Sequence, residues 1–181
     1  LETSWLHFAR SYLTKLRQPP LSVNHTLKLG MDVAIENPAE VGADRIVNAV
    51  AGYEWAKGAV IVVDFGTATT FDCVSKKGEY LGGVITPGVQ ISADALFARA
   101  ARLHRVDFVT PAKAIGRNST QSMQSGIVFG YAAMVDGLCK RLKRELGDGA
   151  RVVATGGLST LIGKETEEIE AVDGDLTLTG L

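Results

Sequence analysis

The chain has 181 residues, of which 46% are hydrophobic and 22% charged, and its formal net charge is −1. This length suffices for one large domain or two small ones with a buried core. The scattered basic residues argue against a nucleic-acid partner, and no apolar run is long enough to cross a membrane. Cys73 and Cys139 lack metal-type spacing, which predicts reduced thiols in a cytoplasmic protein.

The first third of the chain predicts two helices separated by an extended segment. Apolar residues at helical spacing predict a helix over residues 5–16. Residues 27–35 favour an extended conformation, which Asn37-Pro38 interrupts. A second helix is expected over residues 41–55.

The rest of the chain predicts a strand meander followed by helices and one further strand. Runs of β-branched and aromatic residues predict strands over residues 60–63, 70–74, 80–85 and 152–154. Helices are expected over residues 89–103, 122–146 and 158–163. This order indicates an α/β fold with a mixed sheet flanked by helices.

The segment from Asp64 to Asp72 brings an acid, a glycine and several hydroxyls to one turn. Gly66 lets the backbone approach a ligand closely, and the hydroxyls of Thr67, Thr69 and Thr70 can donate to phosphate oxygens. The segment has no Gly-Lys-Ser/Thr ending and leads into a strand, so it is neither a P-loop nor a dinucleotide fingerprint. It predicts a phosphate-binding hairpin. The alternative is a hairpin whose threonines only favour strand geometry.

A second polar segment, Gly42-Ala43-Asp44-Arg45, opens the helix expected over residues 41–55. Asp44 and Asn48 share a face of that helix, and Arg45 can clamp a carboxylate with two donors. An acid beside such a clamp can deprotonate an alcohol whose own carboxylate the arginine holds. The alternative is that Asp44 complements the helix N-terminus and Arg45 is solvated.

Two glycine-containing segments, Gly82 to Gly88 and Thr155 to Ser159, are expected where a strand passes into a helix. Backbone donors and a helix N-terminus would then face the same space. Together with the hairpin they would enclose a nucleotide. Taken singly, each is more often only a tight connection.

The order and spacing of six segments along nearly the whole chain are similar to those of a known family. The segments are Asn37-Pro38, Glu40 to Arg45, Asp64 to Asp72, Gly82 to Gly88, Ser122 to Gly126 and Thr155 to Gly157. Together they resemble type III pantothenate kinases, which belong to the actin-like and sugar-kinase ATPase superfamily. The resemblance implies an actin-like, ribonuclease H-like fold of two related halves with ATP between them. Residues 1–57 would be the remainder of the N-terminal half, and residues 58–181 the C-terminal half.

The resemblance also implies a reaction: ATP-dependent phosphorylation of pantothenate to 4'-phosphopantothenate, the first step of coenzyme A biosynthesis, by a homodimer. ATP, Mg²⁺ and a monovalent cation, K⁺ or NH₄⁺, would be the cofactors. Two alternatives stay open. One is a non-catalytic homologue that acts as a regulatory accessory factor, and the other is a kinase for another small alcohol.

By the same resemblance, individual residues acquire expected roles. Asp44 would be the catalytic base, and Asp64 would bind the monovalent cation. Ser119 would reach pantothenate across the dimer. Pantothenate would also be held by Gly42, Ala43, Asp44 and Arg45. ATP would be bound by Gly66, Thr67, Thr69, Thr70, Gly156 and Gly157.

The sequence departs from the family pattern in three ways. The family opens with a phosphate loop, a strand carrying Asp and a Gly-Asn-Thr turn, and this chain begins downstream of it at Leu1, so we expect that an upstream segment has been lost and that the chain alone is inactive. Ser119 replaces a threonine and keeps its hydroxyl. Ile35 stands where many relatives have a substrate-contacting tyrosine.

Overall fold

The computed structural model describes residue 23 and residues 30–100, 103–147 and 149–181. The helix expected over residues 5–16 lies outside these ranges. Among the described residues, no helix has the length and apolar character needed to span a membrane. Both cysteines are buried and neither forms a disulfide.

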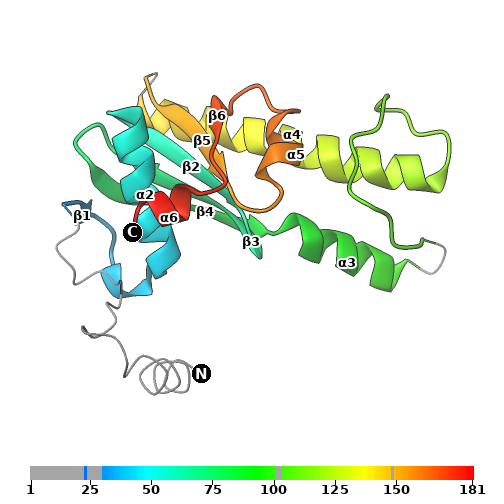
Figure 1. The fold of residues 1–181 in the computed structure, drawn as a ribbon, viewed down its shortest axis with the longest axis horizontal. Helices are drawn as coiled ribbons and strands as arrows, with labels where there is room; N and C mark the ends of the chain where they lie inside the picture. The colour runs from blue at the N-terminus through cyan, green and yellow to red at the C-terminus, as the bar shows by residue number, and fades with distance from the viewer. Residues whose placement is uncertain (1–22, 24–29, 101–102, 148) are drawn as a thin grey trace, which may run out of the picture.

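A six-stranded mixed sheet forms the centre of the molecule (Figure 1). The strand order is β1-β4-β3-β2-β5-β6. Strands β2, β3 and β4 form an antiparallel meander, whereas β5 runs parallel to β2, β6 to β5, and β1 to β4. The strands are β1 (Asp32–Val33), β2 (Val60–Phe65), β3 (Ala68–Val74), β4 (Glu79–Pro87), β5 (Arg151–Thr155) and β6 (Ala171–Val172). The predicted mixed sheet is confirmed.

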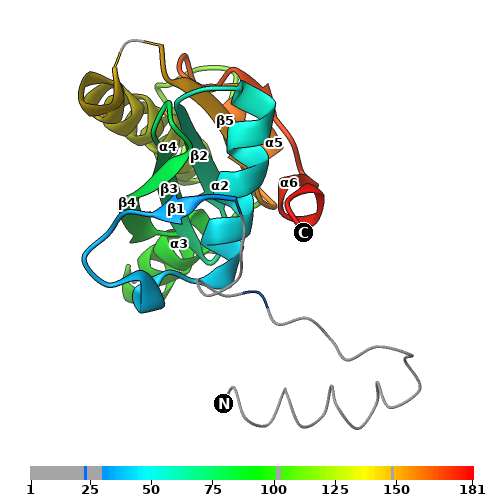
Figure 2. The same cartoon turned by 90° about the vertical axis from the view of Figure 1, so that its left-hand side faces the viewer.

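Helices cover both faces of this sheet. Figure 2 shows α4 on one side and α2 and α6 on the other. Beyond the sheet, α3 runs beside the first half of α4, and the two together form an arm (Figure 1). The helical elements are the 3₁₀ turn η2 (Pro38–Glu40) and the helices α2 (Ala43–Ala56), α3 (Val89–Arg99), α4 (Ser119–Leu146), α5 (Ser159–Gly163) and α6 (Leu176–Thr179).

Strand β2 is buried on both faces and divides the core in two. Ile61, Val63 and Phe65 pack in the cluster that includes α4, whereas Val60 and Val62 pack in the cluster that includes α2. A parallel neighbour and helices on both sides explain why the strand is a continuous apolar run. A Cβ added to Gly52 of α2 would lie 2.4 Å from Val62, so this glycine lets the helix approach the sheet closely.

The structure corrects one prediction about the glycine segments. Gly82 and Gly83 lie inside β4 and not in a turn between a strand and a helix; only Gly88, the N-cap of α3, has that position. Leu81 is the extra residue of a β-bulge opposite Cys73 and Val74, and Gly82 supplies its positive φ of 95°. A Cβ at Gly83 would lie 1.7 Å from the Phe71 carbonyl oxygen, so no side chain fits there.

Other differences concern the ends of the chain and of the helices. Helix α3 ends at Arg99, four residues earlier than predicted, and α4 begins at Ser119 because Asn118 caps it by accepting from the Gln121 N–H. Strand β6 and helix α6 were not predicted. The division between residues 57 and 58 stays a prediction, although β1 and α2 join the same sheet and core as the later strands.

Candidate functional site

Helix α2 directs two polar side chains onto two carboxylates of the sheet. Arg45 and Asn48 lie one turn apart on the same helix face. Asp72 of β3 pairs with Val62, two residues before Asp64 on β2, so the two acids are diagonal neighbours on one face of the sheet. Arg45 bonds to Asp72, and Asn48 bonds to Asp64. The predicted helix and hairpin therefore face each other.

Asp72 is a completely buried carboxylate with 0% exposure. Its Oδ1 accepts from Arg45 Nε at 2.7 Å and from the Tyr80 hydroxyl at 2.8 Å, and its Oδ2 accepts from the Thr70 hydroxyl at 3.2 Å. Burial raises the pKa of Asp72, and the Arg45 charge and these hydrogen bonds oppose that rise. Arg45 is thus an anchored residue and not a solvated one.

Asp64 is the last residue but one of β2 and is partly buried. Its Oδ2 accepts from Asn48 Nδ2 at 3.0 Å, and Asn48 in turn accepts at Oδ1 from the Thr177 hydroxyl at 2.7 Å. Desolvation raises the pKa of Asp64; the Asn48 hydrogen bond opposes this, and the negative charge of Asp44 adds to it. Asp44 and Asp64 therefore lie within electrostatic reach of each other.

Asp44 occupies the first turn of α2, where its negative charge complements the helix N-terminus. Its side chain is exposed, and its Oδ1 accepts from the Arg45 backbone N–H at 2.9 Å. A Cβ at Gly42 would lie 2.6 Å from that same Oδ1, so the glycine makes room for the carboxylate. Asp44 thus presents an exposed carboxylate whose charge acts on the partly buried Asp64.

Two glycines bring the predicted phosphate-binding segments together. A Cβ at Gly156 would lie 2.5 Å from Asp64 Oδ1 and 2.7 Å from the Phe65 backbone, and its φ is 91°. A Cβ at Gly88 would lie 2.1 Å from the Thr67 carbonyl oxygen. The N-terminus of α3, the 66–67 turn and the 156–157 turn therefore meet beside Asp64.

The threonines of the hairpin point in different directions. Thr67 is exposed in the turn, and Thr70 lies on the same face as Asp72, to which it donates. Thr69 is 0% exposed, and its hydroxyl has no hydrogen-bond partner among the described residues. Of the hairpin residues predicted to bind ATP, Thr69 is therefore the one that a ligand cannot reach.

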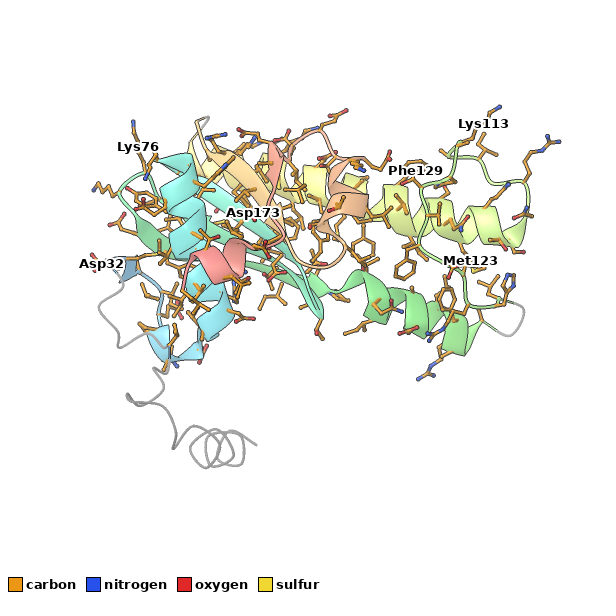
Figure 3. The ribbon with its side chains drawn as sticks, viewed as in Figure 1. Asp32, Lys76, Lys113, Met123, Phe129 and Asp173 are labelled. Carbon is orange, nitrogen blue, oxygen red and sulfur yellow. The ribbon has the colours of Figure 1, made fainter. Side chains whose placement is uncertain are left out.

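Ser119 lies apart from these residues. It is the first residue of α4, in the arm, and it lines a cavity of about 840 Å³ between α3 and α4. Figure 3 places the nearby Met123 at the end of the molecule far from Asp32 and Asp173. Within one chain, then, Ser119 does not join Asp44 and Asp64.

Comparisons with known proteins identify the family of this chain. A family model described as type III pantothenate kinase matches residues 2–141. The type III pantothenate kinase of Desulfatibacillum aliphaticivorans is 55% identical over 175 residues, which cover 96% of this chain and 67% of that protein. The type III pantothenate kinase of Myxococcus xanthus is 56% identical over 165 residues, which cover 91% of this chain and 64% of that protein. The chain belongs to the type III pantothenate kinase family.

The chain spans about two thirds of the length of the curated type III pantothenate kinases that it matches. Its fold is also similar to a crystal structure of a conserved Baf family transcriptional activator from Campylobacter jejuni, with a TM-score of 0.59 at 17% identity over 96% of this chain and 74% of that one. That likeness concerns the fold alone. The mixed α/β architecture is the one expected for the type III pantothenate kinase family, so the predicted fold class is confirmed.

Sequence reasoning missed three residues of this candidate site. Tyr80 and Asp72 were assigned no role, although an acid between Phe71 and Cys73 in an apolar strand already signals a buried, paired carboxylate. Thr177 carries no such signal, because it contacts Asn48 from 129 residues away in the chain. The described residues contain no cluster of three or more acidic, histidine or cysteine side chains that could hold a metal ion.

Proposed function

We propose that this protein phosphorylates pantothenate with ATP to give 4'-phosphopantothenate, the first step of coenzyme A biosynthesis. Membership of the type III pantothenate kinase family supports the reaction. The observation that carries the proposal is that Asp64 borders the 66–67 turn and is bonded to Asn48 of the helix that Asp44 opens, so that the Asp44 charge acts on the same carboxylate. Phosphoryl transfer needs an acceptor base, a phosphate cradle and charge neutralisation close together.

Asp44 is the proposed base for the pantothenate hydroxyl. Its carboxylate is exposed and accepts one backbone hydrogen bond, so it retains acceptor capacity for a substrate proton. The adjacent Arg45 would hold the pantothenate carboxylate, with Gly42 and Ala43 forming the backbone of the same turn. Such positioning supplies much of the rate in this kind of reaction.

The ATP phosphates would lie against the 66–67 turn and the N-terminus of α3. Gly66 and Thr67 are exposed there, and Gly156 and Gly157 border the same place. Backbone N–H groups and a helix N-terminus favour a bound anion. The Thr70 hydroxyl donates to Asp72 and Thr69 is buried, so a contact of either threonine with ATP would require its side chain to turn toward the phosphates.

Asp64 is the proposed ligand of the monovalent cation. Asn48 occupies its Oδ2, whereas its Oδ1 accepts no hydrogen bond within the described residues and faces the space left by Gly156. A desolvated carboxylate oxygen with unused lone pairs suits a cation such as K⁺ or NH₄⁺. Bound there, the cation would offset negative charge beside the ATP phosphates, and Mg²⁺ would accompany the nucleotide.

We further propose that the active form is a homodimer in which Ser119 serves the site of the partner subunit. Two observations support this. Ser119 is remote from Asp44 within one chain, and it lies on an arm that projects beyond the sheet. A projecting arm can bring its side chains to another subunit.

The two alternatives predict different behaviour. A regulatory accessory factor would keep the fold and bind nucleotide without transferring phosphate, and the fold neighbour named as a transcriptional activator does not separate this case from a kinase. A kinase for another small alcohol would share Asp44 and the hairpin but reject pantothenate. The intact acid and hydroxyl set favours a kinase over an accessory factor.

The test is a phosphorylation assay with the protein at its full natural length. ATP, Mg²⁺ and K⁺ are supplied with pantothenate or with a panel of small alcohols, and products are identified by mass. The proposal predicts 4'-phosphopantothenate as the preferred product, with turnover falling when Na⁺ replaces K⁺. Nucleotide binding without any product would support the accessory factor, and preference for another alcohol would support the third possibility.

A further inference from the structure

We propose that Asp72 is a positioning residue for substrate recognition. It holds Arg45 from inside the protein by the Nε atom and thereby presents the outer guanidinium nitrogens to the carboxylate of pantothenate. This inference rests on the proposed function, because it assigns Asp72 a role only through Arg45 and that substrate.

The first support is the completeness of the Asp72 contacts. Three donors, from Arg45, Tyr80 and Thr70, approach its two oxygens at 2.7–3.2 Å. All four residues converge on one face of the sheet, beneath the first turns of α2. A buried carboxylate fixed by three donors has no freedom to turn away from Arg45.

The second support is the way in which Arg45 is held. The guanidinium group is planar, so a short bond at Nε restricts the positions that its two terminal nitrogens can take. Its carbon atom also lies 5.9 Å from the centroid of the Tyr80 ring. The side chain is 18% exposed, and the terminal nitrogens donate no hydrogen bond to any residue that the structure describes. These nitrogens are therefore the donors left for a ligand.

The third support is energetic. A protein with a buried ion pair is often no more stable than the same protein with apolar residues of similar size in its place. Stability alone is therefore a weak reason for an acid among the apolar residues of β3. Asp72 lies diagonally opposite Asp64, and Arg45 adjoins Asp44. The ion pair is thus built at the site itself, where the orientation of Arg45 matters for carboxylate recognition.

The experiment compares two substrates that differ only at the group that Arg45 would read. Pantothenate carries a carboxylate, and pantothenyl alcohol carries CH₂OH in its place. The full-length wild type, Asp72→Asn and Tyr80→Phe are assayed with both. Asp94→Asn is the matched control, because Asp94 also pairs with an arginine, Arg105, at 2.7 Å, but does so on the surface of α3.

For Asp72→Asn we expect KM for pantothenate to rise about tenfold, while kcat and KM for ATP and for pantothenyl alcohol change less than about threefold. Tyr80→Phe keeps the ring and should shift KM for pantothenate in the same direction by about threefold. If Asp72→Asn does not fold, Tyr80→Phe decides. Asp94→Asn should behave as wild type with both substrates.

Equal losses for both substrates would show a merely structural role and overturn the inference, as would an unchanged KM for pantothenate. In either case an active wild type leaves the proposed function intact. A wild type that does not phosphorylate pantothenate would overturn the proposed function, and the role of Asp72 with it.

Discussion

Asn48 joins Thr177 of helix α6 to Asp64, the last residue but one of β2. Its Nδ2 donates to Asp64 Oδ2 at 3.0 Å, and its Oδ1 accepts from Thr177 of α6 at 2.7 Å. Because Asn48 is buried, both bonds are protected from water. The orientation of Asp64 therefore depends on a helix that is remote in sequence.

Replacing Asn48 with alanine should destabilise the protein. The change leaves the partly buried Asp64 carboxylate and Thr177 hydroxyl without their partner, and each lost hydrogen bond costs about 0.5–1.5 kcal/mol or more. The measurement is the free energy of unfolding in urea. The control is Asn37→Ala, which removes an exposed amide and should cost less than about 0.5 kcal/mol. Equal costs for the two variants would contradict the described network.

Gly156 should tolerate no side chain, whereas its neighbour should. Gly156→Ala places a Cβ 2.5 Å from Asp64 Oδ1 in a backbone with φ of 91°, and that conformation alone costs about 1–2 kcal/mol. A Cβ at Gly157 meets nothing within 4 Å. Thermal unfolding should therefore show a clear loss of stability for Gly156→Ala and little change for Gly157→Ala. A stable Gly156→Ala protein would show that the turn is looser than described.

Most of the fold could be predicted from local patterns. The strands of the meander and helices α2 and α4 were predicted because runs of β-branched residues and helical periodicity are strong signals. Strand β1 lies within residues 27–35, which were predicted to be extended. The two-residue β6 and the four-residue α6 carry no such period, since they form only through pairing and packing with distant elements. Gly82 and Gly83 were misassigned because a bulge and a turn have the same sequence signature.

The site could be predicted only in part. Asp44 was identified because it stands at the start of a recognisable helix, and Asp64 and the hairpin because they follow a recognisable apolar strand. Asp72 was identified only as the end of that segment, since its role depends on Arg45 and Tyr80, which reach it from other elements. Nor does the sequence show that Thr67 lies in an exposed turn whereas Thr69, two residues later, is buried in β3.

Thr69 and Thr70 should respond in opposite ways to replacement by valine. The Thr69 hydroxyl is buried and has no partner among the described residues, so Thr69→Val should raise the free energy of unfolding by about 1 kcal/mol. Thr70→Val removes a donor to the buried Asp72 carboxylate and should lower the free energy of unfolding by about 1–2 kcal/mol. Urea denaturation of the two variants provides the comparison. A destabilised Thr69→Val would mean that the hydroxyl has a partner.

Asp64 should make stability depend on pH in a definite direction. Desolvation raises its pKa above 3.8, so the stability linked to its protonation is fully present below that value and is lost as pH rises through the folded-state pKa. Asp64→Asn has no proton to lose at this position, so the variant keeps that stability as the pH rises. The variant should have a higher urea midpoint than wild type at pH 7.5 without K⁺, and the difference should shrink as the pH is lowered.

The control for this experiment is Asp107→Asn, an exposed carboxylate outside the site, which should change the midpoint little. A difference between Asp64→Asn and wild type that grows as the pH is lowered would contradict the assigned direction. Adding K⁺ should stabilise the wild type more than Asp64→Asn, because the proposed cation ligand is missing from the variant.

The central claim is that Asp44 activates the pantothenate hydroxyl, and the most direct measurement is the kcat of Asp44→Asn at full natural length with ATP, Mg²⁺ and K⁺. Glu54→Gln, an exposed acid on the same helix, is the control and should keep wild-type turnover. We predict that Asp44→Asn folds normally and loses at least about 100-fold in kcat, as expected when a general base is removed. Wild-type turnover by Asp44→Asn would contradict the account.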